Sequence, residues 1–186
     1  MSATQHLTSE DQELIQSTFD RIAADLGMII NRTVDVSECR AERLDYRAAG
    51  EGSVHISFRL GVRIDGVNQQ GCFLLPLAEA VSVAGYLMTM SDEEVVECRS
   101  RVTLDTSMKG ALLEVGNFIA GACDAVLRPS LPEGASIRSE GCQGVRAGVR
   151  PALEYEEDLI IGYATGRIDE FPEFPLIVML PDCVTK

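Results

Sequence analysis

Two polar side chains of complementary type, Glu114 and Asn117, stand inside the otherwise apolar stretch LLEVGNFIAGAC at residues 112–123. Residues three apart on a helix are neighbours on its surface, so this spacing places a carboxylate beside a carboxamide. The carboxylate can form a directional ion pair, and the carboxamide can both donate and accept hydrogen bonds. The pair could therefore present a polar face to a binding partner, or it could occupy the solvent face of an ordinary helix.

A helical wheel gathers these polar positions into one narrow stripe. An α-helix advances about 100° per residue, so with Gly110 at zero, Glu114 lies at ~40°, Asn117 at ~340° and Gly121 at ~20°. Ser107 and Asp124 flank this stripe. The rest of the wheel is predicted to face the core and carries Met108, Leu112, Val115, Phe118, Ile119, Cys123, Val126 and Leu127.

The glycines around Asn117 are costly, because each glycine inside a helix destabilises it by about 0.5–1 kcal/mol relative to alanine. Gly110, Gly116 and Gly121 also leave backbone uncovered. A partner that approaches the helix closely would require such a surface. Close packing against a neighbouring helix would explain the glycines equally well.

The elements that position this helix follow from hydrophobic periodicity and turn residues. Ser9 is the predicted N-cap of the first helix, and Ser91 with Glu94 opens a short one. Gly-rich segments such as GVNQQG and GASIRSEGCQGVRAG are interpreted as hairpin turns. The predicted helices span residues 9–31, 77–90, 91–102 and 105–128. The predicted strands span residues 33–46, 53–64, 72–77, 136–148, 156–169 and 175–182.

This order predicts an α/β (α+β) fold in a single domain over residues 9–186, preceded by a flexible N-terminal tail over residues 1–8. A faint two-fold repeat is conceivable, in which each half holds one long helix and a set of strands. Glu13 and Gln16 of the first helix would then lie where Glu114 and Asn117 lie in the second.

Composition narrows the function classes. The 186 residues carry 29 acidic and 16 basic side chains, a net charge of −13, so neither nucleic acid nor an anionic membrane is an expected partner. The apolar stretch at residues 71–88 is interrupted by Pro76 and Glu79 and is a poor membrane span. The polar start lacks a secretion signal, which predicts a cytoplasmic protein with reduced thiols.

No metal or nucleotide site is expected. No two of the six cysteines form a CxxC pair, and each is interpreted as a small buried hydrophobic residue. His6 and His55 have no partner in the sequence, and no Walker lysine loop occurs.

The segment LLEVGNFIAGACDAVL, residues 112–127, resembles the motif helix of the CheC/CheX/FliY family of chemotaxis phosphatases. In that family a Glu precedes an Asn by three residues and a Gly follows the Asn by four, as Glu114, Asn117 and Gly121 do here. The order of elements over residues 9–185 is also similar. The single Glu-x-x-Asn copy makes the chain most like single-site CheX.

The resemblance implies a mostly antiparallel sheet packed against two long helices. It also implies a phosphatase acting on the aspartyl phosphate of a CheY-type receiver domain, with Glu114 binding the receiver's active-site Lys and Asn117 orienting the attacking water. The receiver carries its own Mg²⁺, so no cofactor is expected in this chain. The partner-binding face would include Gly110, Gly121, Ser107 and Asp124, and a homodimer would be shared with CheX.

Two positions depart from the family pattern. Gly110 stands where Asp or Ser is usual, and Glu140 stands where a Pro is usual. The alternative reading is a non-catalytic CheX-like module that binds a receiver or another signalling partner through the same face.

Overall fold

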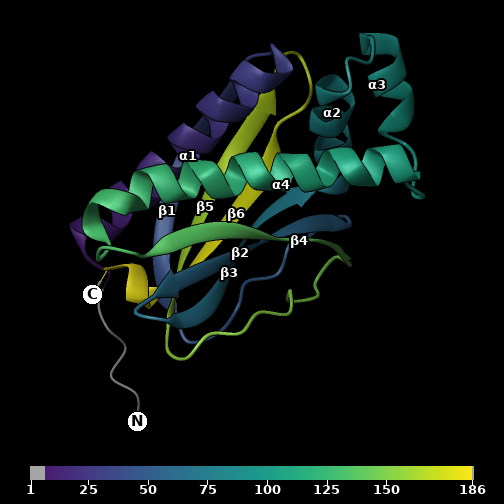
Figure 1. Ribbon diagram of the computed structural model, residues 1–186. Helices are drawn as coiled ribbons and strands as arrows, with labels where there is room; N and C mark the ends of the chain where they lie inside the picture. The colour runs from purple at the N-terminus through teal and green to yellow at the C-terminus, as the bar shows by residue number, and fades with distance from the viewer. Residues whose placement is uncertain (1–6, 186) are drawn as a thin grey trace.

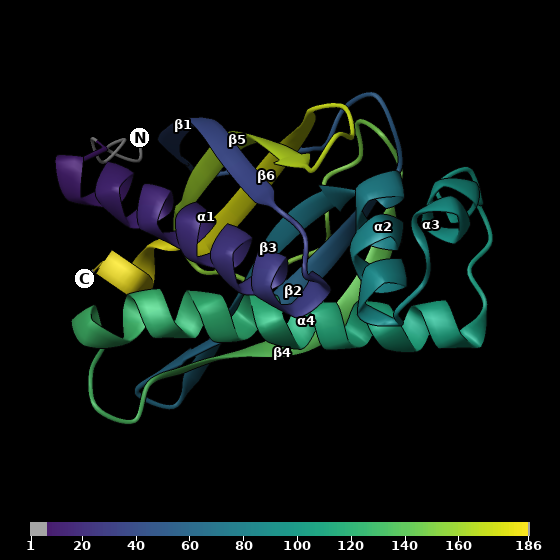
Figure 2. The same ribbon diagram turned by 90° about the horizontal axis from the view of Figure 1, so that it is seen from above.

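The computed structural model describes residues 7–185. Its centre is one antiparallel sheet with the strand order β1-β5-β6-β3-β2-β4. The strands are β1 Val34–Leu44, β2 His55–Ile64, β3 Val67–Pro76, β4 Ser136–Val145, β5 Leu159–Ile168 and β6 Phe174–Pro181. The two long helices lie across one face of this sheet, and two shorter helices stand at one end (Figures 1 and 2). The predicted α+β fold is confirmed.

The helices are α1 Ser9–Ile30, α2 Leu77–Leu87, α3 Asp92–Cys98 and α4 Thr106–Leu127, with 3-10 turns at Arg128–Ser130 and Asp182–Thr185. Side-chain caps begin three of the four helices of residues 7–185, namely α1, α3 and α4. Ser91 and Glu94 form the predicted capping box of α3. Thr8, not Ser9, caps α1, because its hydroxyl accepts the Asp11 N–H while Asp11 accepts the Thr8 N–H. Of the tail predicted over residues 1–8, residues 1–6 lie outside the described residues.

The interpretation of the glycine-rich segments as turns is wrong over most of their length. Only Asp65 and Gly66 turn between β2 and β3, both with positive φ, and the pairing resumes at Ile64–Val67. An Asp-Gly pair suits this two-residue hairpin because both central positions need positive φ. Ser136–Val145 confirms the strand that was also predicted over residues 136–148, whereas Val67–Gly71 was predicted only as a turn. Both are strands because pairing across the sheet outweighs the poor strand propensity of their Asn, Gln and Gly residues.

The sheet order contains an approximate two-fold repeat. Reading outward from the central β6–β3 pair gives β5 then β1 on one side, and β2 then β4 on the other. A rotation that exchanges α1-β1-β2-β3 with α4-β4-β5-β6 therefore preserves the order. The repeat proposed from the sequence is present in the topology, with α1 and α4 as the matching long helices (Figure 2).

Most of the core lies between the helices and the sheet. Phe19 of α1, Phe58 of β2, Phe73 of β3 and Ile119 of α4 are almost fully buried there. A smaller apolar cluster covers the opposite sheet face, where Cys72, Leu74, Leu159, Ile161, Ile177 and Met179 are buried. The segments that follow β1 and β4 cross this second face (Figure 1).

Helix α4 is long and apolar enough to cross a membrane by length and composition alone. In the fold it packs against α1, α2 and β4 and carries exposed polar residues on its outer side. This arrangement is that of a core helix in a folded domain.

A buried ionic cluster joins the two ends of the described chain. Arg43 of β1 donates from Nη2 to both carboxylate oxygens of Asp11 at 3.2 Å, and its Nη1 lies 3.6 Å from Asp182 Oδ2. All three side chains are almost fully buried. Burial would raise the pKa of Asp11, but hydrogen bonds from the Thr8 backbone and Arg43, with the charge of Arg43, lower it below its ordinary value.

The substitution Arg43→Met tests this cluster. It leaves two carboxylates buried without their cation, so we expect the free energy of unfolding to fall by about 3–5 kcal/mol in urea titrations. Arg21→Met is the matched control, because Arg21 forms an exposed pair with Asp25 one turn away and should cost less than about 0.5 kcal/mol. Equal small losses in the two variants would contradict a structural role for the cluster.

Candidate functional site

The rotation of α4 about its axis is set by its packing on the sheet. Val115 and Ile119 are fully buried, and Gly116 faces strands β2 and β4. A Cβ atom at Gly116 would lie 3.1 Å from Ser139 Oγ and 3.3 Å from Phe58 Cδ1, which is tighter than ordinary contact. The helix can approach the strands this closely because residue 116 has no side chain.

Asp124 fixes the C-terminal part of α4 to the edge strand. Its Oδ1 accepts the backbone N–H of Ile137 at 2.9 Å, and its Oδ2 accepts from Arg128 one turn later. The side chain is only 21% exposed. Asp124, predicted to face a partner, therefore has its carboxylate engaged within the chain.

The Glu114–Asn117 pair lies on the outer side of α4, and both side chains are exposed. Asn117 Nδ2 donates to Glu114 Oε2 at 3.4 Å, a long and therefore weak hydrogen bond. The helix thus presents a carboxylate and a carboxamide side by side on a convex surface. Breaking this hydrogen bond costs little free energy, so either group can exchange it for a stronger interaction with a binding partner.

The three glycines of the helix separate into two kinds. Gly116 is explained by packing against strands, not against a helix as one sequence-based alternative had it. Gly110 and Gly121 are exposed, and a Cβ at either would meet nothing within 4 Å. Packing inside the chain therefore does not account for these two. Ser107 is also exposed in the first turn, so it lies on the same open face.

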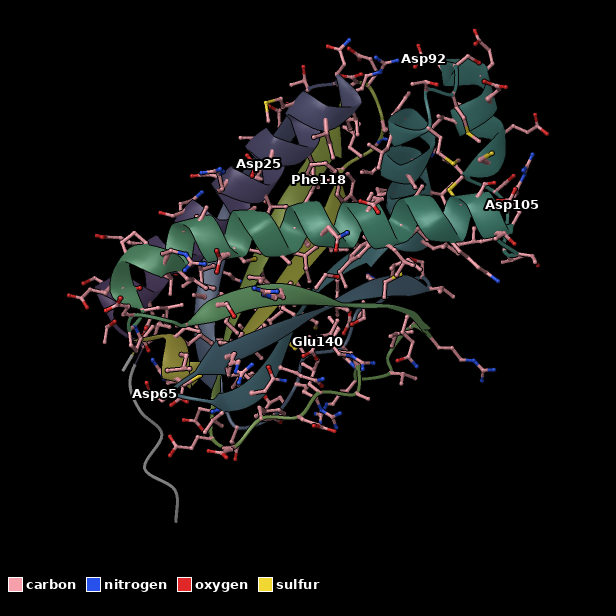
Figure 3. The ribbon with its side chains drawn as sticks, in the orientation of Figure 1. Asp25, Asp65, Asp92, Asp105, Phe118 and Glu140 are labelled. Carbon is pink, nitrogen blue, oxygen red and sulfur yellow. The ribbon has the colours of Figure 1, made fainter. Side chains whose placement is uncertain are left out.

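Two apolar side chains on this face were not predicted to be there. Phe118 was assigned to the core, yet it is 38% exposed, and Leu113 is 47% exposed. The wheel contained the signal, since Phe118 falls at ~80° and Leu113 at ~300°, on either side of the polar stripe. The apolar face had been drawn too wide. Phe118 lies near the middle of α4 (Figure 3), and it directly follows Asn117 in the chain.

Glu140, which stands where the family usually has Pro, belongs to the side of the sheet away from α4. Its Oε1 accepts from Asn68 Nδ2 at 3.0 Å and its Oε2 accepts from Gln70 Nε2 at 2.6 Å. The carboxylate reaches these β3 amides across Gly61 of β2, which it contacts closely. Figure 3 shows Glu140 on β4, well separated from the outer face of α4. The glutamate at this position therefore hydrogen-bonds β4 to side chains of β3 within the sheet.

The matching helix α1 uses its polar side chains differently. Gln12 donates to Cys39 O and accepts from Ala41 N, so it holds the helix to strand β1. Gln16, the counterpart considered for Asn117, donates to Asp20 at 2.9 Å. The carboxamides of α1 are therefore engaged within the chain.

Within residues 7–185, no group of three or more His, Cys, Asp and Glu side chains could hold a metal ion. Cys72, Cys98 and Cys123 are buried as predicted, whereas Cys39, Cys142 and Cys183 are half-buried. Burial raises the pKa of the Cys72 and Cys123 thiols to about 12, so both stay protonated at neutral pH.

No family model and no curated protein matches this sequence. Solved structures do match over nearly the whole chain. FliY from Thermotoga maritima has 16% identity and a TM-score of 0.63, covering 96% of this chain and 93% of its own. A chain of the FliG–FliM complex from H. pylori has 11% identity and a TM-score of 0.66, covering 95% of each chain.

The chemotaxis protein CheX from Desulfovibrio desulfuricans has 14% identity and a TM-score of 0.58, covering 89% of this chain and 97% of its own. At such identities the likeness concerns the fold, and it extends over the described sheet and both long helices. Together with the sheet order, it shows that this chain has the CheC/CheX/FliY fold.

Proposed function

We propose that this protein is a phosphatase that hydrolyses the aspartyl phosphate of a CheY-type receiver domain, in chemotaxis or two-component signalling. The observation that carries the proposal is the exposed Glu114–Asn117 pair on the outer face of α4, in a chain whose fold is shared with chemotaxis proteins. Such a substrate lies in the cytoplasm, so the proposal includes a cytoplasmic location.

The convex shape of the site fits a macromolecular substrate. A receiver domain would bring the aspartyl phosphate and its Mg²⁺ to the helix, and α4 would supply only positioning. Water attacks phosphorus, the bond between phosphorus and the aspartyl oxygen breaks, the carboxylate leaves, and the water proton passes to the released phosphate. Positioning and charge stabilisation account for most of the catalysis in such transfers.

Each member of the pair has a role that its chemistry supports. The Asn117 carboxamide can accept from the attacking water through its oxygen and donate to a phosphate oxygen through its nitrogen. Its weak bond to Glu114 is easily exchanged for these. Glu114 can pair with the receiver's lysine, and that ion pair would fix the register of docking. Leu113 and Phe118 supply apolar contact area on both sides.

A second candidate is a non-catalytic module that binds a receiver or another chemotaxis or flagellar protein through the same face. Gly110 favours it, because the family usually has a polar side chain there. The likeness to a chain of the FliG–FliM complex also favours it, since that assembly is a protein–protein complex. A homodimer remains part of the proposal under either function.

The substitution Asn117→Ala separates the two candidates. We expect it to slow dephosphorylation of a phospho-receiver by about 10²-fold, because the attacking water loses its orientation, while receiver binding is retained. The measurement is loss of radiolabelled phosphate from purified phospho-receivers of the source cell, alongside a binding titration. Gln16→Ala is the matched control on α1 and should leave the rate unchanged. Binding of a receiver by wild type without acceleration would favour the non-catalytic module.

The glycines give a second test. In Gly121→Leu the new side chain points into open space, so the helix should become more stable by about 0.5–1 kcal/mol while dephosphorylation falls at least tenfold. In Gly116→Ala the added Cβ presses on Phe58 and Ser139, so the free energy of unfolding should fall. The dephosphorylation rate should fall only in proportion to the loss of folded protein. Thermal unfolding and the phosphate-release assay measure the two effects. An unchanged rate in Gly121→Leu would show that nothing docks over residue 121.

A further inference from the structure

A hollow lies on the sheet face opposite α1 and α4. Its walls are the segments that follow β1 and β4, which run beneath the sheet in Figure 1. Its volume is about 1260 Å³ including the open mouth. Four nitrogen-bearing side chains line it, three from residues 40–55 and one from the segment after β4, namely Arg40, Arg47, His55 and Arg150, and we call it the basic pocket.

Hydrogen bonds hold the walls of the basic pocket together. The Gly148 N–H donates to Gly50 O at 2.7 Å, and Arg47 Nη1 donates to Pro151 O at 2.8 Å. Gly50 lies flat against the imidazole of His55, where a Cβ would be 2.6 Å from three ring atoms. The walls of the pocket are therefore held in place by the fold, and Arg40 and Arg150 reach the pocket as exposed side chains.

The arginines of the pocket are not neutralised by carboxylates. Among the ion pairs of residues 7–185, none involves Arg40, Arg47 or Arg150. Arg40 instead lies over the Tyr163 ring at 3.9 Å and Arg150 over the Tyr46 ring at 4.8 Å. These stacks fix the guanidinium planes and leave their N–H edges available.

Acidic groups offset this charge only in part. Glu51 is the one carboxylate in the lining, and nearby Glu42 accepts the Tyr163 hydroxyl. Three guanidinium groups against one lining carboxylate leave an excess of two positive charges. This excess occurs in a chain whose net charge is −13, so it is a local feature and not a reflection of composition.

His55 adds an unpartnered buried polar atom to the same lining. It is 2% exposed, and its Nδ1 lies 2.8 Å from Ser53 O. A carbonyl oxygen only accepts, so Nδ1 carries a hydrogen, and in the neutral ring Nε2 is the acceptor. Nε2 has no hydrogen-bond partner among residues 7–185. Buried polar atoms almost always have one, so Nε2 is an unsatisfied acceptor in the wall of the pocket.

We propose that the basic pocket binds a small dianion of the phosphate-ester class. The forked N–H groups of arginine match phosphate oxygens, and the surplus of two positive charges matches a doubly charged ligand. A hydroxyl group on the organic part of such an ester can donate to His55 Nε2. The pocket lies across the sheet from Glu114 and Asn117, so the proposal does not rest on phosphatase activity.

Calorimetric titration with glycerol 2-phosphate, a phosphate monoester that is a dianion just above neutral pH, tests the proposal. We expect saturable binding by wild type at millimolar or lower concentration, and at least tenfold weaker binding by the double variant Arg40→Ala/Arg150→Ala. Arg101→Ala is the control, because that arginine pairs with Glu97 on the helical side and should bind as wild type. Absent binding by wild type, or equal binding by the double variant, would overturn the proposal.

A spectroscopic readout places the ligand. The chain has two histidines, so in a His6→Ala background the imidazole nitrogen spectrum reports His55 alone. Glycerol 2-phosphate should shift the Nε2 signal along the same saturation curve as the heat, and the shift should vanish in the double variant. An unmoved signal would refute contact at His55. Asn117→Ala should give the wild-type curve, which separates this pocket from the α4 site whether or not α4 is catalytic.

Discussion

The seating of Gly116 against β2 and β4 is the constraint on which the outer face of α4 depends. A helix packed at a glycine has one permitted rotation, because any neighbouring side chain turned toward Phe58 and Ser139 would collide with them. Asp124 then holds the helix to the backbone of Ile137 two turns later. With these contacts in place, residues 114 and 117 must face outward. A turn of one residue, about 100°, would move one of them toward the sheet.

The approximate two-fold repeat shows that the exposed pair is not a requirement of the fold. Helices α1 and α4 occupy matching places above the same sheet, yet α1 commits Gln12 to strand β1 and Gln16 to Asp20. In α4 the strand contact is made by Asp124, nearer the helix end. Among residues 7–185, the side chains of Glu114 and Asn117 therefore share only a 3.4 Å hydrogen bond with each other. The same fold therefore accommodates α1, whose glutamine side chains are hydrogen-bonded within the chain, and α4, whose Asn117 side chain can bind a partner.

Local signals in the sequence were sufficient for the helices and for the polar stripe. Caps such as Ser91 with Glu94 act within one turn, and the spacing of Glu114 and Asn117 defines a shared face without reference to other elements. The strand over Val67–Gly71 was missed because its pairing with β2 is stabilised across the sheet and not by its own residues. The basic pocket could not be predicted, since Arg40, His55 and Arg150 meet only when β1, β2 and the segment after β4 are placed together.

The glycines of α4 differ in whether packing in the fold requires them. Gly116 is needed, because a Cβ there would press on the sheet. Gly110 and Gly121 each cost the helix about 0.5–1 kcal/mol and fill no tight space in return. Beside them, Leu113 and Phe118 stay partly exposed although either could be buried at a gain. This face carries uncovered backbone, exposed apolar side chains and a polar pair joined by a weak hydrogen bond. Permanent exposure of such a face to solvent would bring no gain in stability. The face is suited to a protein surface that covers all of these at once.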